Sequence, residues 1–257
     1  GLVYFAFQIY CDFSGYSDIA IGTAKLFGIE LMSNFKFPYF SRDIGEFWRR
    51  WHISLSSWFR DYLYIPLGGS KGGKWISIIN IFVIFIVSGF WHGANWTFLV
   101  WGGLHGAYLI IAIVLIKPKE YILNILNLEG GFIHKLYQVT FTFVLVVFAW
   151  IFFRANNISD AFYVINNMFS DIGDYTNLGK MKINLRGLGI GINDILISIG
   201  LIAFMELYNL YERSGDVWIK LEQKPIWLRW GAYYILLFGI LFLAPYSRVN
   251  NFIYFQF

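Results

Sequence analysis

Two histidines in this sequence occupy surroundings in which an ionisable side chain is costly. His52 lies in a stretch rich in tryptophan and arginine, and His92 lies in a run from Trp75 to Ile116 that has no Asp, Glu, Lys or Arg. Ionisable residues at membrane depth are rare and are functional candidates by default. An imidazole kept neutral by burial can accept a proton near pH 7, so general base catalysis is the chemistry these residues suggest.

Two other interpretations compete with catalysis. A lone histidine in an apolar helix is more often a hydrogen-bonded structural residue, and we expect His105 to be structural or to line a tunnel. Intramembrane histidines also relay protons in transporters. Against a transporter stand the lack of internal repeats and the lack of clustered intramembrane carboxylates in the sequence.

The uncharged run that holds His92 is long enough for two membrane crossings, since each needs about 20 apolar residues. Its small and polar residues gather between Ser88 and Asn95, so we expect the turn there. His92 is then at or near the apex of a helical hairpin. If the helices are instead broken, the apex lies inside the membrane, where protein or a water-filled cavity must surround it.

The stretch that holds His52 is predicted to be one continuous helix. Asp43 and Glu46 form a capping-box pattern at its start, and Pro66 followed by two glycines marks its end. The ionisable side chains between these signals favour a helix that lies in the membrane interface or faces a hydrated cavity. At 100° per residue, one face carries Arg49, Ser56 and Arg60, and a tryptophan-rich apolar stripe comprises Trp48, Trp51, Leu55, Trp58 and Tyr62.

The composition is that of an integral membrane protein. The chain is 58% hydrophobic and 21% aromatic, with only 14% charged residues. Its single cysteine excludes an internal disulfide and a Cys-rich metal site, and we expect no metal. Basic residues are scattered through the predicted loops, which suits contact with anionic membrane lipid and argues against nucleic-acid binding.

The pattern as a whole predicts an all-α, polytopic transmembrane helix bundle with re-entrant and interfacial amphipathic helices, forming a single membrane domain over residues 1–257. We expect the first spanning helix to break between Asp12 and Asp18 and a separate short segment to follow. The remaining expected elements are a loop at 117–135, crossings at 136–153, 187–211 and 230–244, an amphipathic helix at 160–169 and an interfacial tail at 246–257.

Three long motifs resemble the membrane-bound O-acyltransferase family, in the branch of the alginate O-acetyltransferase membrane subunit. The resemblance is dense over roughly the first 106 residues, and the amino-terminal helices of the family are missing, so we interpret the chain as the C-terminal part of a longer protein. The motifs are CDFSGYSDIAIG (Cys11 to Gly22), FWRRWHISLSSWFRDYLYIPLGG (Phe47 to Gly69) and FWHGANWTFLVWGGLHG (Phe90 to Gly106), followed by the terminal FIYFQF.

The resemblance implies a tunnel through the membrane and two functional histidines, which match His92 and His52. It implies that an acyl group, most simply acetyl, passes from a cytosolic thioester to a hydroxyl of an exported cell-envelope polysaccharide. The donor would be acetyl-CoA or an acyl carrier protein, as a co-substrate rather than a bound cofactor. An extracytoplasmic partner resembling an acyltransferase or esterase is implied too, as is a bacterial inner or plasma membrane location. D-alanyl transfer to teichoic acid is the close alternative.

This chemistry suggests roles for the polar and aromatic residues beside the histidines. Arg49, Arg50 and Arg60 are candidates to hold the phosphates of coenzyme A or of a phosphopantetheine arm. Asn95 is a candidate hydrogen-bond donor to the oxyanion that develops on the carbonyl. Trp96 belongs to the aromatic surroundings expected to desolvate His92 and to contact the substrate. The alternative role for the arginines is interfacial anchoring.

Overall fold

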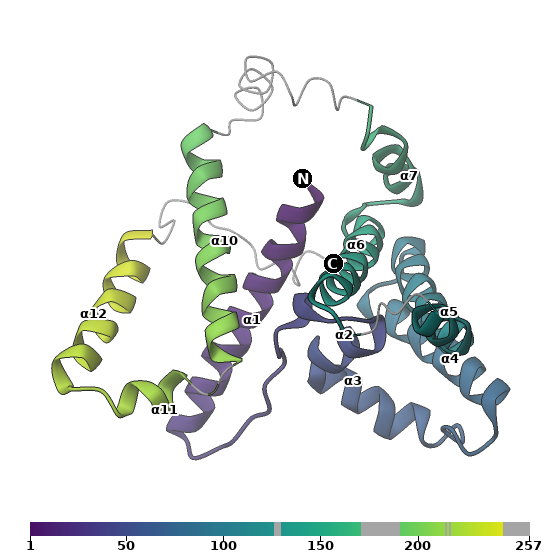
Figure 1. Ribbon diagram of the computed structural model, residues 1–257, viewed down its shortest axis with the longest axis horizontal. Helices are drawn as coiled ribbons and strands as arrows, with labels where there is room; N and C mark the ends of the chain where they lie inside the picture. The colour runs from purple at the N-terminus through teal and green to yellow at the C-terminus, as the bar shows by residue number, and fades with distance from the viewer. Residues whose placement is uncertain (126–129, 171–190, 214, 216, 244–257) are drawn as a thin grey trace. The chain divides into compact units, whose positions relative to one another are not determined.

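The computed structural model of the chain describes residues 1–125, 130–170, 191–213, 215 and 217–243. Every regular element within these residues is a helix (Figure 1), which confirms the predicted all-α class. The described residues fall into two compact units, Gly1–Ser170 and the described part of Asp171–Phe252.

Among the residues that the structure describes, four helices are long and apolar enough to cross a membrane. They are α4 (Lys74–His92), α5 (Trp96–Ile125, apolar through Ile116), α6 (Phe132–Arg154) and α10 (Ile192–Glu212). The chain is therefore a multi-pass membrane protein, as its composition predicts. The run from Trp75 to Ile116 does contain two crossings, while α12 (Ile226–Leu243), at the last predicted crossing, is apolar but shorter.

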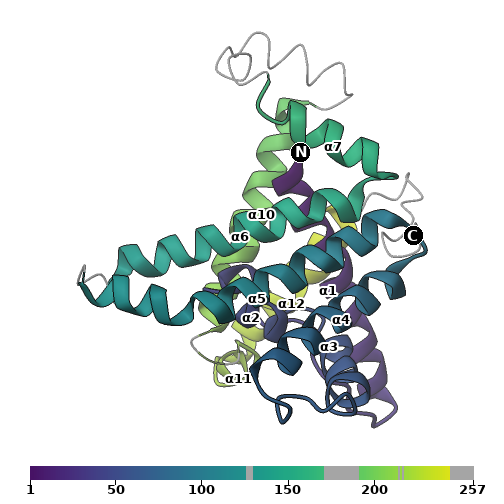
Figure 2. The ribbon, with the colours of Figure 1, turned by 90° about the vertical axis from the view of Figure 1, so that its right-hand side faces the viewer.

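Helices α4 and α5 form a tight antiparallel hairpin, and Figure 2 shows them side by side. Glycines permit the close approach, because a Cβ atom on Gly102 would lie 2.2 Å from the carbonyl oxygen of Phe85. A Cβ atom on Gly89 would lie 2.3 Å from the carbonyl oxygen of Phe98. Small residues allow this kind of backbone contact between membrane helices. The hairpin places His92 at the last position of α4, as predicted.

Helix α1 (Leu2–Leu26) runs without interruption, so the predicted break between Asp12 and Asp18 is wrong. Ser14 lies inside the helix and donates a hydrogen bond of 3.5 Å from Oγ to the carbonyl oxygen of Cys11 one turn earlier. A serine bonded in this way fits a helix interior without freeing backbone groups. The separate segment expected after residue 18 is thus the last part of α1.

The predicted single helix beginning after Asp43 is instead divided. Its start is correct, since the Asp43 side chain accepts a 2.7 Å hydrogen bond from the backbone N–H of Glu46. The helix then stops, because His52 has a left-handed backbone with φ of 45°. The segment consists of α2 (Ile44–Arg50), α3 (Ile53–Phe59) and the π-helical turn η2 (Arg60–Tyr64), preceded by the 3₁₀ turn η1 (Pro38–Phe40).

The remaining elements follow the predictions with shifted ends. α6 extends the predicted crossing at both ends, and α7 (Ile158–Asn167) is the expected short amphipathic helix. The loop predicted at 117–135 is partly wrong, because α5 continues to Ile125. α11 (Val217–Glu222) precedes α12. The predicted tail at 246–257 lies outside the described residues.

Candidate functional site

His92 lies where three helices meet. It ends α4, and its ring packs edge-on against Trp101 of α5 and Phe153 of α6, with ring centroids 5.1 Å apart in both pairs. Its neighbour Trp91 stands at 5.0 Å, also edge-on. Aromatic side chains therefore surround His92, but of those expected from the sequence (Phe90, Trp91 and Trp96) only Trp91 is among these ring contacts. Trp101 and Phe153 come from α5 and α6.

His52 occupies the junction of α2 and α3, outside the four candidate membrane spans. Its side chain is 8% exposed, and its ring stands edge-on to Phe13 of α1 at 4.6 Å. Burial lowers the pKa of His52 to about 4. The imidazole is therefore neutral at pH 7, because desolvation disfavours its charged form.

The structure brings the two predicted histidines together around one tryptophan. The Trp91 ring lies 5.0 Å from the ring of His92 and 6.2 Å from that of His52. The two imidazoles are close enough to interact electrostatically. Their elements are separate in the sequence, so only the packing of α1 to α4 creates this pair.

A cavity of about 390 Å³ lies between the α2–α3–η2 segment and the α4–α5 hairpin, and neither His52 nor His92 is among its lining residues. Arg49, Ser56 and Arg60 all line it, as the predicted shared face requires, although the helix is divided. Ser88, one turn before His92, lies on its wall. Apolar side chains form most of the remaining lining, including Trp48, Leu55, Phe59, Ile81, Ile84, Phe85 and Leu109.

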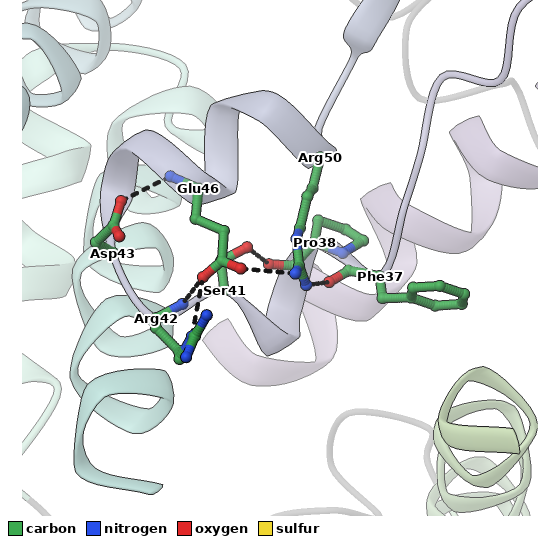
Figure 3. Close-up of polar contacts among 7 residues, drawn as sticks. All are labelled: Phe37, Pro38, Ser41, Arg42, Asp43, Glu46 and Arg50. Atoms are coloured by element: carbon green, nitrogen blue, oxygen red, sulfur yellow. Dashed lines mark hydrogen bonds and ion pairs between the residues drawn. The ribbon is translucent and has the colours of Figure 1, made fainter. Parts of the chain in front are cut away.

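Arg50 is placed differently from the other two candidate arginines. Its guanidinium pairs with the Glu46 carboxylate at 2.6 Å and donates a 3.3 Å hydrogen bond to the carbonyl oxygen of Phe37 (Figure 3). The same Glu46 carboxylate accepts a hydrogen bond from the backbone N–H of Arg42 at 2.6 Å. Arg50 therefore ties α2 to the preceding connector, and it is absent from the lining of the cavity.

Asn95 and Trp96 lie at the start of α5. The Asn95 side chain accepts a 3.1 Å hydrogen bond from the backbone N–H of Thr97 and donates one of 2.8 Å to the carbonyl oxygen of Asn156. These bonds cap α5 and join it to the segment after α6. Trp96 is 73% exposed, so it is not part of the buried surroundings of His92.

His105 is fully buried between α2 and the hairpin. Its Nδ1 accepts a hydrogen bond of 3.2 Å from the indole Nε1 of Trp48. An imidazole that accepts at Nδ1 carries its proton on Nε2. Stacking against Phe47 and edge contacts with Trp101 complete its packing. These contacts give His105 a structural place, one of the two alternatives expected for it.

Two residues at the site were not anticipated from the sequence. Phe13 packs on the His52 ring, and Asn34 forms hydrogen bonds to the residues that follow His52. A phenylalanine in an apolar helix and an asparagine in a proline-containing connector give no local signal of such a role.

Comparison with known proteins gives consistent similarities. Residues 1–118 match the sequence profile of the membrane-bound O-acyltransferase family. The chain is 41% identical over 213 residues to a probable alginate O-acetylase of Pseudomonas syringae pv. tomato, which covers 82% of this chain and 38% of the relative. It is 42% identical over 164 residues to a peptidoglycan O-acetyltransferase of Helicobacter pylori, which covers 64% of this chain and 30% of that relative.

A third relative transfers a different group. The chain is 37% identical over 130 residues to a teichoic acid D-alanyltransferase of Streptococcus thermophilus, which covers 48% of this chain and 31% of the relative. The chain thus spans less than half the length of each of these three relatives.

Proposed function

Because the chain belongs to the membrane-bound O-acyltransferase family through residues 1–118, we propose that this protein transfers an acyl group, namely acetyl, from a thioester to a hydroxyl of an exported cell-envelope polysaccharide. The observation that carries the proposal is the meeting of His52 and His92 at Trp91. His92 acts as the general base, and His52 orients the donor or polarises its carbonyl.

The reaction needs one proton acceptor and one proton donor. The acceptor hydroxyl loses its proton to His92 while its oxygen attacks the thioester carbonyl carbon, forming the new ester bond. The carbon–sulfur bond then breaks, and the departing sulfur takes the proton from His92. A positioned base contributes typically 10² to 10⁴ in rate. The aromatic rings around His92 hold the imidazole in place and keep water from the reacting atoms.

The lining of the cavity between the α2–α3–η2 segment and the α4–α5 hairpin suits the thioester donor. Coenzyme A and carrier-bound phosphopantetheine both combine phosphate groups with a long, largely uncharged arm. Arg49 on the cavity lining would bind phosphate oxygens, and Arg60 would do so in place of its exposed ion pair with Asp61. The apolar wall would contact the arm. Arg50 is engaged with Glu46 and would act on the donor only indirectly.

The acceptor follows from the relatives named for alginate and peptidoglycan acetylation. We propose that the donor approaches from the cytoplasmic side and that an extracytoplasmic partner completes delivery to the polymer. The D-alanyltransferase relative supports a second candidate, D-alanyl transfer from a carrier protein to teichoic acid.

The test is acyl transfer by the full-length protein in proteoliposomes. Labelled acetyl-CoA and a labelled D-alanyl carrier protein are offered separately, with polysaccharide or teichoic acid as acceptor. We expect acetyl labelling of polysaccharide and a loss of about 10² to 10⁴ in rate for His92→Ala. His134→Ala is the matched control, because His134 lies near the end of α6 away from Phe153.

Three outcomes contradict the proposal in different ways. If a well-expressed His92→Ala protein acylates the acceptor at the wild-type rate, His92 is not the general base. Labelling only from the D-alanyl donor favours the second candidate. Proton flux that depends on His92, without acylation, indicates a transporter.

A further inference from the structure

The connector before η1 runs beside the segment that contains His52. The backbone N–H of Lys36 donates a 3.0 Å hydrogen bond to the carbonyl oxygen of Arg50, and the backbone N–H of Ile53 donates one of 3.1 Å to the carbonyl oxygen of Asn34. These two bonds lie on either side of His52 in the sequence. The connector therefore holds the backbone at the point where α2 and α3 are divided.

The backbone conformation that results is unfavourable for a histidine. His52 and Phe37 are the non-glycine residues with positive φ in the described part of the chain. Such a conformation is strained for a residue with a side chain and persists only where surrounding contacts impose it. Residues of this kind cluster at functional sites, so the contacts that impose the conformation are part of the site's construction.

Asn34 supplies most of these contacts. Its Oδ1 accepts hydrogen bonds from the backbone N–H of Ser54 at 3.2 Å and from the Ser54 hydroxyl at 2.6 Å. Its Nδ2 donates a 3.2 Å hydrogen bond to the hydroxyl of Ser17. Ser17 is buried in α1, one turn after Phe13, whose ring touches the His52 ring. Asn34 thus joins α1 to the start of α3 directly beside His52.

The position of His52 at the start of α3 explains why Asn34 is needed there. His52 is the N-cap residue of α3, but its side chain forms no capping hydrogen bond. An N-cap side chain normally accepts a hydrogen bond from the backbone N–H of the second or third residue of the helix, and Ser54 is the second residue of α3. Asn34 provides that acceptor from outside the helix, which leaves the imidazole directed toward Phe13 and Trp91.

We infer that Asn34 is a positioning residue for His52: it imposes the left-handed backbone and so directs the imidazole toward Trp91 and His92. The catalytic consequence rests on the proposed function, whereas the structural consequence does not. A misplacement of about 1 Å can lower a rate by 10². Loss of Asn34 should therefore reduce turnover more than it reduces binding of the donor.

The experiment compares Asn34→Ala with two other variants of the full-length protein. We expect Asn34→Ala to lower kcat for acyl transfer by about 10- to 100-fold, with KM for the thioester changed less than about twofold. Asn34→Asp keeps the acceptor for Ser54 and should recover much of kcat. Ser33→Ala is the matched control, since the exposed Ser33 hydroxyl bonds only within the connector, to the carbonyl oxygen of Phe35.

A double variant separates positioning from general stability. In a His52→Ala background, Asn34→Ala should cause no further loss of kcat, because the side chain that it positions is gone. A loss that multiplies with the loss from His52→Ala means that Asn34 acts independently of His52, which overturns the inference. Wild-type kcat in a folded Asn34→Ala protein overturns it as well.

A chemical measurement tests whether Asn34 positions His52 even if acyl transfer is not observed. Carbethoxylation of each histidine by diethyl pyrocarbonate is followed by mass spectrometry. Asn34→Ala should increase the rate at His52 and leave the rate at His105 unchanged; an unchanged His52 rate contradicts the inference. If Asn34→Ala does not insert into membranes, Ser54→Ala takes its place, with the same expected increase and the same contrary outcome.

Discussion

The indole Nε1 of Trp48 donates a 3.2 Å hydrogen bond to Nδ1 of the fully buried His105. The bond joins α2 to the α4–α5 hairpin, and it fixes the neutral tautomer with the proton on Nε2. Trp48 also lines the cavity between the α2–α3–η2 segment and the α4–α5 hairpin. His105, which has no role in the proposed chemistry, thus supports one wall of the proposed donor site through Trp48.

Replacing Trp48 by phenylalanine should destabilise the protein. The change leaves Nδ1 of His105 buried without a donor, which costs about 1–3 kcal/mol. Thermal unfolding in detergent should show a lower midpoint for Trp48→Phe. Trp58→Phe is the matched control because Trp58 is 52% exposed, and it should shift the midpoint little. Equal shifts in the two variants would mean that the hydrogen bond is not the source of stability.

The hairpin offers a test on two adjacent glycines. A Cβ atom on Gly102 would lie 2.2 Å from a backbone oxygen, whereas one on Gly103 would meet its nearest atom, Cδ1 of Ile86, at 3.6 Å. Gly102→Ala must push α4 and α5 apart, at a cost of about 1–3 kcal/mol. Gly103→Ala should be near neutral or slightly stabilising.

The measurement for this pair is again the unfolding midpoint in detergent, together with acyl transfer. Because His92 ends α4, separation of the hairpin should also lower the rate in Gly102→Ala. A Gly102→Ala protein as stable as Gly103→Ala would show that the two helices do not pack this closely.

Helices in this chain were predictable where apolar length decides them. The crossings at α4, α5 and α6 were expected from uncharged runs, and the start of α2 from the capping pattern at Asp43. The division at His52 was not predictable. It depends on hydrogen bonds from Asn34 and Lys36, which lie far outside the local periodicity of the segment. The break expected in α1 is wrong because the polar residues between Asp12 and Asp18 fit within a continuous helix.

The three candidate arginines should separate into two classes. Arg49→Ala and Arg60→Ala remove cationic groups from the cavity lining, so KM for the thioester should rise by about tenfold, which is about 1.4 kcal/mol of lost binding. Arg50→Ala should instead lower the unfolding midpoint, because it removes the 2.6 Å ion pair of the part-buried Glu46 carboxylate and leaves that group only its contacts with Arg42.

Steady-state kinetics and thermal unfolding of the same three proteins check this division. A raised KM in Arg50→Ala with unchanged stability would show that the Arg50 guanidinium binds the thioester donor. An unchanged KM in both Arg49→Ala and Arg60→Ala would show that the thioester donor does not bind in this cavity.

The candidate site could be predicted from the sequence only in part. His52 and His92 were identified by their unusual surroundings, and the structure places them around Trp91. Which arginine faces the cavity was not predictable, because it depends on whether Glu46 captures the side chain. Asn95 illustrates the same limit: its amide groups cap α5 and reach the carbonyl of Asn156, partners that a linear pattern does not reveal.

The stability of the protein should depend on pH through His52. Burial lowers the pKa of His52 to about 4 from an ordinary value of 6.5. Between these values the unfolded chain binds a proton that the folded chain does not, so the free energy of unfolding falls as the pH falls from 6.5 to 4. Above pH 6.5 both states are neutral at this residue, and the contribution is constant.

In His52→Gln this group no longer titrates, so the unfolding midpoint in detergent should fall less steeply below pH 6.5 than in the wild type. Parallel curves for the two proteins would show that His52 is not buried as described. The same pKa predicts that His52 stays neutral from pH 6 to 8, so any ionisation seen in the acyl-transfer rate over that range must belong to another group.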